Sequence, residues 1–297
     1  MRKFLLTCMT FTAICLCSCT STENENDAVS SSEPSTSRVE LLTTRMLAMN
    51  GGKSYRDAVE DGTRLPSPNF TRKDGMKIAI ADAKGAIKGA MTGGAWGAVG
   101  NGVVSSVIKA TKIYATRLVT GYFVDQMHMR IPSNSNGGEI EDSVGYYHNL
   151  VEYDMYQQQP DLYTMTTMNV YTMADNILRQ KSPLYARQML SLSYMLATIS
   201  DVNTLRSIDE DESMTFVEYV DALMEAYPNE EEYIDMIAQY IYDIYYANGD
   251  MDDYTNEILW IIETSDLTDI EVSILKSAVL VAYSSTLYNT NMVFTQN

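Results

Sequence analysis

Three groups of side chains in this sequence have the types and spacing that could bind a metal ion or act in catalysis. Met127-His128-Met129 joins two thioethers to an imidazole, and soft ligands of this kind suit Cu(I). No Cys lies nearby and there is only one His, so we interpret His128 as an ordinary loop or helix-end residue.

A second group has oxygen-bearing side chains at several offsets of a calcium-binding EF-hand loop. These residues are Asp201, Asn203, Ser207, Asp209 and Glu212. Leu205 stands at a ligand position, however, and Arg206 replaces the glycine that the turn of such a loop requires. The span is better interpreted as a solvated loop between helices.

Paired acids offer a third kind of chemistry. Asp252 and Asp253 could supply the two carboxyl groups of a glycosidase, which lie about 5–10 Å apart across the sugar. Residues 139 to 297 contain 28 acidic side chains, however, so some adjacent pair is inevitable. The chain has no Walker A, HExxH, GxSxG or GxGxxG motif. We therefore expect no catalytic residue, no metal site and no cofactor.

The composition suits a globular protein of one or two domains. The chain has 297 residues, of which 45% are hydrophobic, and its formal net charge is -18. Such a negative charge argues against binding to nucleic acid, which requires Lys and Arg to neutralise phosphates. With only two His, the sequence also offers little for a zinc site or a Ser/His relay.

Residues 1–18 have the pattern of a secretion signal. Arg2 and Lys3 precede an apolar stretch, which ends in Leu16-Cys17-Ser18-Cys19. This end resembles the lipobox of bacterial lipoproteins. The resemblance implies cleavage between Ser18 and Cys19, and acylation of Cys19 as the first residue of the mature chain. All four cysteines lie within residues 1–19, so no disulfide can link the mature fold.

Residues 19–37 are rich in Ser, Thr, Glu and Asn, a composition that predicts a flexible tether rather than a packed element. Thr20 follows the Cys, and acidic residues come soon after it. This arrangement resembles lipoproteins of the Gram-negative outer membrane, including those exported to the cell surface. We therefore expect a lipid-anchored protein of the cell envelope.

The rest of the chain divides into two regions of opposite charge. Residues 38–132 form a basic region, in which residues 38 to 130 carry 14 Lys and Arg against 7 acids. Residues 139–297 carry 5 Lys and Arg against 28 acids. Two oppositely charged layers of one fold would explain this asymmetry. The alternative is a basic face that meets anionic lipid or a partner.

The basic region contains a Gly/Ala-rich segment, residues 76–122. Its glycines Gly85, Gly89, Gly93 and Gly97 recur every fourth residue, which places them on one helix face where another helix can approach closely. Gly93-Gly94 and Gly100-Asn101-Gly102 favour breaks, and hence a helical hairpin. The segment resembles glycine-zipper regions of envelope lipoproteins and membrane-active bacteriocin peptides. It is therefore either tightly packed protein core or a segment that contacts membrane.

The acidic region predicts a bundle of helices. Caps, proline and glycine positions and apolar spacing favour helices near residues 141-158, 161-180, 183-200, 214-226, 230-247, 252-263 and 268-288. An earlier helix is expected from Arg38 to Met49. The predicted fold class is all-α, with a Gly/Ala-rich helical hairpin and an acidic multi-helix bundle.

These features favour a lipid-anchored envelope protein that acts by binding rather than catalysis. Its expected partners are the membrane, through the lipid on Cys19, and a protein or lipid that meets the basic Gly/Ala segment. One alternative is a bacteriocin-like protein that inserts its glycine segment into membranes. Another is an envelope hydrolase that uses carboxylates.

Overall fold

The computed structural model describes residues 37–57, 71–116, 143–159, 162–187, 191–208, 213–246 and 250–294. Within these ranges the chain forms ten α-helices and two short 3-10 helices, with no strand, and this confirms the predicted all-α fold. The elements are α1 (Arg38–Met49), η1 (Tyr55–Asp57), α2 (Arg72–Thr116), α3 (Val144–Gln158), η3 (Leu162–Thr164), α4 (Thr167–Lys181), α5 (Pro183–Arg187), α6 (Leu192–Ile208), α7 (Phe216–Ala226), α8 (Glu231–Tyr246), α9 (Met251–Glu263) and α10 (Asp269–Phe294).

The helix α2 is a hairpin of two arms. Gly94 interrupts it with φ 61° and ψ -157°, a backbone conformation that only glycine adopts without strain. Residues 72–93 form the first arm and residues 95–116 form the second arm. The predicted Gly/Ala-rich hairpin and its turn at Gly93-Gly94 are confirmed. The second predicted break, at residues 100–102, is wrong, because the second arm stays helical there.

The two arms touch through their backbones near the turn. A Cβ on Gly89 would lie 2.0 Å from the carbonyl oxygen of Gly97, and a Cβ on Gly97 would lie 2.3 Å from that of Gly89. One turn further along, a Cβ on Gly85 would lie 2.6 Å from the carbonyl oxygen of Asn101. Glycine is therefore needed at these positions because any side chain would separate the arms.

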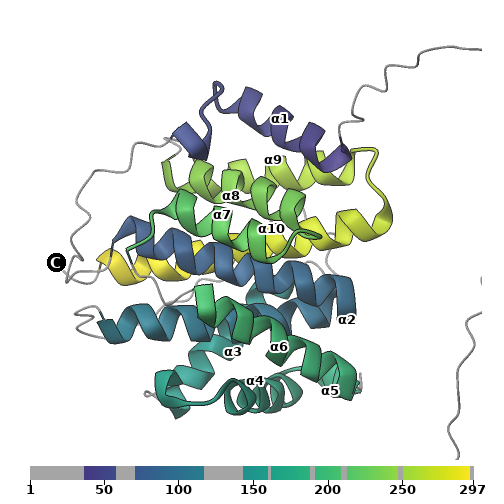
Figure 1. The fold of residues 1–297 in the computed structure, drawn as a ribbon. Helices are drawn as coiled ribbons and strands as arrows, with labels where there is room; N and C mark the ends of the chain where they lie inside the picture. Colours follow the sequence, from purple (N-terminus) through teal and green to yellow (C-terminus); the bar gives the residue numbers. More distant parts are fainter. Residues whose placement is uncertain are drawn as a thin grey trace, which may run out of the picture. The chain divides into compact units, whose positions relative to one another are not determined.

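The hairpin lies in the middle of one compact unit, residues 36–297. In Figure 1, α1, α7, α8 and α9 lie on one side of it, and α3, α4, α5 and α6 lie on the other. The long helix α10 packs along α2. Apolar side chains of the second arm, such as Val99, Val103 and Val107, are fully buried. The hairpin thus contributes side chains to two buried apolar clusters, one mainly with α1, α7, α8, α9 and α10 and the other mainly with α3, α4, α5 and α6.

Local capping explains where several helices begin. Thr215 and Glu218 form a reciprocal capping box at the start of α7, and Thr268 and Glu271 exchange the same kind of hydrogen bonds at the start of α10.

The predicted single helix over residues 183–200 is wrong. The chain instead forms α5 and then α6, which continues through residues 201–208, where the sequence predicts a loop.

Candidate functional site

The first candidate site is a set of ionisable side chains enclosed where both arms of α2 meet α3. Asp82 and His148 are 0% exposed, and Glu152 is 1% exposed. His148 Nε2 lies 3.8 Å from Asp82 Oδ2, and the Ser106 hydroxyl donates a hydrogen bond of 3.1 Å to Glu152 Oε1. Two carboxyl groups and an imidazole thus share one interior region, where a net charge is costly. We call these three residues the acid cluster.

Burial sets the protonation of the acid cluster. It raises the pKa of Asp82 well above its ordinary value, and the charge of Glu152 raises it further, while the Ser285 and Ser106 hydroxyls oppose the shift. Burial also raises the pKa of Glu152 to about 8, against the hydrogen bond from Ser106. The pKa of His148 falls to about 4 because burial disfavours the imidazolium. Near neutral pH the carboxyl pair therefore retains protons and the imidazole is neutral, so Asp82 and His148 do not form an ion pair.

Several polar atoms around this cluster lack a hydrogen-bond partner among the described residues. They include His148 Nε2 in the cluster and, on the second arm of α2, the Asn101 side-chain amide and the Ser105 hydroxyl. A carboxyl beside an imidazole is a pairing used in general acid–base catalysis. Here the surrounding helices enclose both groups completely. The arrangement can hold or release a proton, but it presents no group to a reactant in solution.

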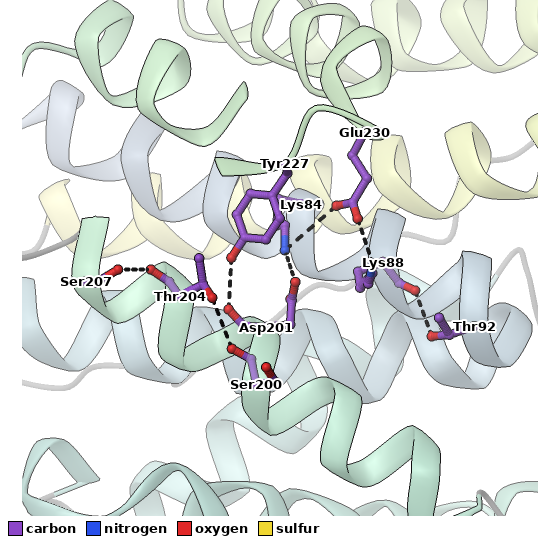
Figure 2. Close-up of polar contacts among 9 residues, drawn as sticks. All are labelled: Lys84, Lys88, Thr92, Ser200, Asp201, Thr204, Ser207, Tyr227 and Glu230. Atoms are coloured by element: carbon purple, nitrogen blue, oxygen red, sulfur yellow. Dashed lines mark hydrogen bonds and ion pairs between the residues drawn. The ribbon is translucent and has the colours of Figure 1, made fainter. Parts of the chain in front are cut away.

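A second group, around a buried lysine, lies on the other side of the first arm, and Figure 2 shows it. The Lys84 side chain is 0% exposed, forms an ion pair with Asp201 of α6 and lies 3.8 Å from Glu230, just before α8. Lys88 lies 3.0 Å from the other oxygen of Glu230. The Lys84 ammonium also sits 3.3 Å from the centre of the Tyr227 ring. We call these five residues the lysine cluster.

The lysine cluster balances its charges internally. Burial lowers the pKa of Lys84, while the carboxylates of Asp201 and Glu230 oppose that change. Burial acts in the same direction on Lys88, but the hydrogen bond and charge of Glu230 raise its pKa overall. Tyr227 donates a further hydrogen bond of 2.9 Å to the Asp201 carbonyl. Ion pairs between the two lysines and the two carboxylates thus join the hairpin to α6 and to the start of α8.

The structure reassigns the residues that suggested a calcium site. Asp201, Asn203 and Ser207 all lie within α6, so they belong to a helix and not to a loop. Asp201 pairs with Lys84, and Asn203 accepts a hydrogen bond of 2.7 Å from the Thr167 hydroxyl. Asp209 and Glu212 lie outside the described residues. In the ranges that the structure does describe, no three His, Cys, Asp or Glu side chains are grouped as metal ligands.

The paired acids Asp252 and Asp253 lie in the first turn of α9, which Asp250 caps. Asp252 accepts a hydrogen bond from the Tyr283 hydroxyl, while Asp253 is exposed. The two side chains therefore differ in surroundings and do not face each other across a shared site. The Met127-His128-Met129 group lies outside the described residues.

Of the predicted contact and anchor residues, Gly85, Gly89 and Gly97 line the interface between the two arms, and Gly93 lies at the turn. Ser18 and Cys19 lie outside the described residues. Trp96 follows the turn, is 5% exposed and packs with its ring centre 5.1 Å from that of Tyr147 and 5.4 Å from that of Tyr185.

Sequence reasoning missed both clusters. One available signal was the presence of Asp82 and Lys84 inside an otherwise small and apolar stretch, because a charge there needs a partner if it is buried. The partners of Asp82 and Lys84 could not be identified from the sequence. Glu152 and Asp201 lie far along the chain, in a region that contains 28 acids.

One segment of the described helices is long and apolar enough to cross a membrane by length and composition. It is Asp269–Asn289 in α10, and 61% of its most apolar window is buried in the protein. That degree of burial is typical of a core helix.

Comparisons with protein-family models, with curated proteins and with solved structures give no match.

Proposed function

We propose that this chain is a lipid-anchored protein of the cell envelope whose helical body acts by binding through its surface. The observation that supports a binding role most directly is the burial of the acid cluster and of Lys84, Asp201 and Glu230. Their ionisable groups are used to join helices, while large apolar side chains such as Leu184, Leu192 and Trp260 are more than half exposed. Exposed side chains of this kind favour contact with a partner.

The sequence supplies the argument for the anchor. Leu16-Cys17-Ser18-Cys19 resembles a lipobox, and α1 begins at Arg38, directly after the predicted tether. A protein held by two or three acyl chains stays on its membrane without a spanning helix, since each buried methylene contributes about 0.8 kcal/mol. We place the protein at the outer membrane, where an acidic tether is also compatible with exposure at the cell surface.

The two alternative functions have less support. Insertion of the glycine segment into a membrane would require the body to open, because α3, α6, α8 and α10 already pack against the hairpin. A hydrolase needs acids that face a shared opening, and Asp252 and Asp253 do not provide that arrangement.

The anchor is tested by labelling cells that express the full chain with radioactive palmitate. Wild type and a Cys8→Ala control, which leaves the lipobox intact, should incorporate label, whereas Cys19→Ala should not. Protease added to intact cells then reports whether the body is outside. Label that persists in Cys19→Ala would contradict the proposed lipid site.

A further inference from the structure

One face of α1 remains open to solvent and combines positive charge with apolar surface. Arg38, Leu41 and Arg45 are spaced by three and four residues and therefore share this face. Leu41 is 58% exposed, whereas Leu42 and Met46 on the opposite side of the same helix are buried. An apolar side chain between two arginines is thus presented outward.

The neighbouring helices extend this face at both ends. The Arg45 guanidinium lies 5.9 Å from the centre of the Trp260 ring on α9, and Trp260 is 54% exposed. At the other end Arg38 lies 3.8 Å from Glu271, which follows Ile270, a side chain that is 71% exposed. We call Arg38, Leu41, Arg45 and Trp260 the α1 face; Figure 1 shows α1 and α9 side by side.

These residue types suit the headgroup layer of a bilayer. Trp places an apolar ring and a polar N–H at that depth, and Arg keeps its guanidinium at the phosphates while its stem covers apolar surface. Glu271 pairs with Arg38, and Glu40 and Glu257 are exposed nearby, so the charge of the face is mixed and its affinity for lipid is modest on its own. Proximity to the membrane must supply the rest.

The chain supplies that proximity. Ser37 caps α1 by accepting a hydrogen bond of 3.1 Å from the Glu40 backbone N–H, so the tether enters the body at this helix. The predicted lipid site, Cys19, precedes Ser37 by 18 residues (37 minus 19). A coil of that length spans about 25 Å on average, which raises the effective concentration of α1 at the membrane to the millimolar range.

We propose that the α1 face rests on the headgroup layer of the bilayer that holds the lipid anchor. The inference rests on the proposed function, because a body without its lipid would meet the membrane too rarely for so weak a contact. The α1 face then fixes the orientation of the body, with α3, α4, α5 and α6 on the side of the hairpin away from the membrane (Figure 1).

The two tryptophans of the chain make this contact measurable. Trp260 is exposed, whereas Trp96 is buried and serves as an internal reference. The lipidated full chain is reconstituted into vesicles of phosphatidylethanolamine with a minority of phosphatidylglycerol, whose acyl chains are brominated near the headgroup. We expect bromine to quench most of the Trp260 emission and the remaining spectrum to match that of Trp260→Phe.

Matched variants locate the contact on the molecule. Leu41→Glu should abolish the quenching, because it places a charge in the middle of the α1 face. Leu192→Glu changes an equally exposed leucine on α6, where Leu192 is 66% exposed, and should leave the quenching intact. Equal effects of the two changes would contradict the proposed orientation.

Flotation of the vesicles separates failure of the anchor from failure of the contact. Protein that does not float with the vesicles overturns the lipid anchor and the contact together. Protein that floats while Trp260 stays unquenched and open to acrylamide overturns the contact alone. Shielding of Trp260 from both acrylamide and brominated lipid would also overturn it, since another protein molecule would then cover the face.

Discussion

Asp82 and Lys84 lie two residues apart on the first arm of α2, and the fold neutralises them in different ways. Lys84 keeps its charge close to the carboxylates of Asp201 and Glu230. Asp82 meets another acid, Glu152, and a neutral imidazole, so protons rather than a counter-ion neutralise it. The lysine cluster is held by ion pairs, whereas the charge state of the acid cluster depends on pH.

The raised pKa of Glu152 makes stability depend on pH. In the unfolded chain this carboxyl has its ordinary pKa of 4.5, but in the folded protein its pKa is about 8. The unfolded state therefore releases its proton first, and the free energy of unfolding falls as pH rises between these values. His148 acts in the opposite sense, because its lowered pKa removes stability as pH falls from 6.5 toward about 4.

Glu152→Gln tests this dependence. The amide cannot ionise, so the variant should gain stability over wild type as pH rises from about 5 to about 8, by roughly 1.4 kcal/mol for each unit of the pKa shift. Urea denaturation at several pH values measures the difference. Glu257→Gln, an exposed change on α9, should show no such trend. A constant difference between Glu152→Gln and wild type would refute the argument.

Lys84→Met tests the lysine cluster. Removal of the buried ammonium leaves Asp201 and Glu230 short of charge compensation and should cost about 3–5 kcal/mol of stability. Lys88→Met removes a side chain that is 33% exposed, and the cost should be about 1 kcal/mol or less. Adding Asp201→Asn to Lys84→Met should recover part of the loss in chemical denaturation. Equal losses from the two lysine variants would show that burial is not the cause.

At the scale of elements, the glycines of α2 determine how closely its arms pack. Gly89 lies against the backbone of Gly97, whereas the nearest atom to a Cβ on Gly100 would be the Tyr194 hydroxyl at 3.6 Å. We therefore expect Gly89→Ala to destabilise the protein by about 1–3 kcal/mol, as overpacking does. Gly100→Ala should be neutral or stabilising by up to about 1 kcal/mol, because alanine favours a helix. Thermal unfolding of the two variants should separate them; if both lose stability equally, the arms do not touch through Gly89.

Most elements were predictable because their signals are local. The cap at Thr268, the Ser182-Pro183 start and the Gly93-Gly94 turn each determine a boundary by nearby backbone chemistry. Helix α6 was misjudged because Asp201, Asn203 and Ser207 are polar and look like loop residues. Asp201 is buried and pairs with Lys84 of the hairpin, and the exposed Asn203 accepts a hydrogen bond from Thr167 of α4. The acid cluster could not be predicted, because its residues are far apart in the sequence and contacts between distant residues leave no periodic pattern.

At the scale of the whole molecule, opposite charges in the two regions meet inside one compact unit. Lys84 and Lys88 of the basic hairpin pair with Asp201 and Glu230 of the acidic region, as expected for oppositely charged layers of one fold. The glycine segment is therefore occupied by protein contacts within the folded body. On this account a lipid on Cys19 is what attaches the protein to a membrane.

The most direct test of this account is the membrane partitioning of full-length wild type and Cys19→Ala, after a sodium carbonate wash of membranes from the expressing cells. The account predicts that wild type stays with the washed membranes, whereas Cys19→Ala is recovered entirely in the soluble fraction. A Cys19→Ala protein that has lost residues 1–18 and still resists the carbonate wash would contradict the account, because a later segment of the chain would then be embedded in the bilayer.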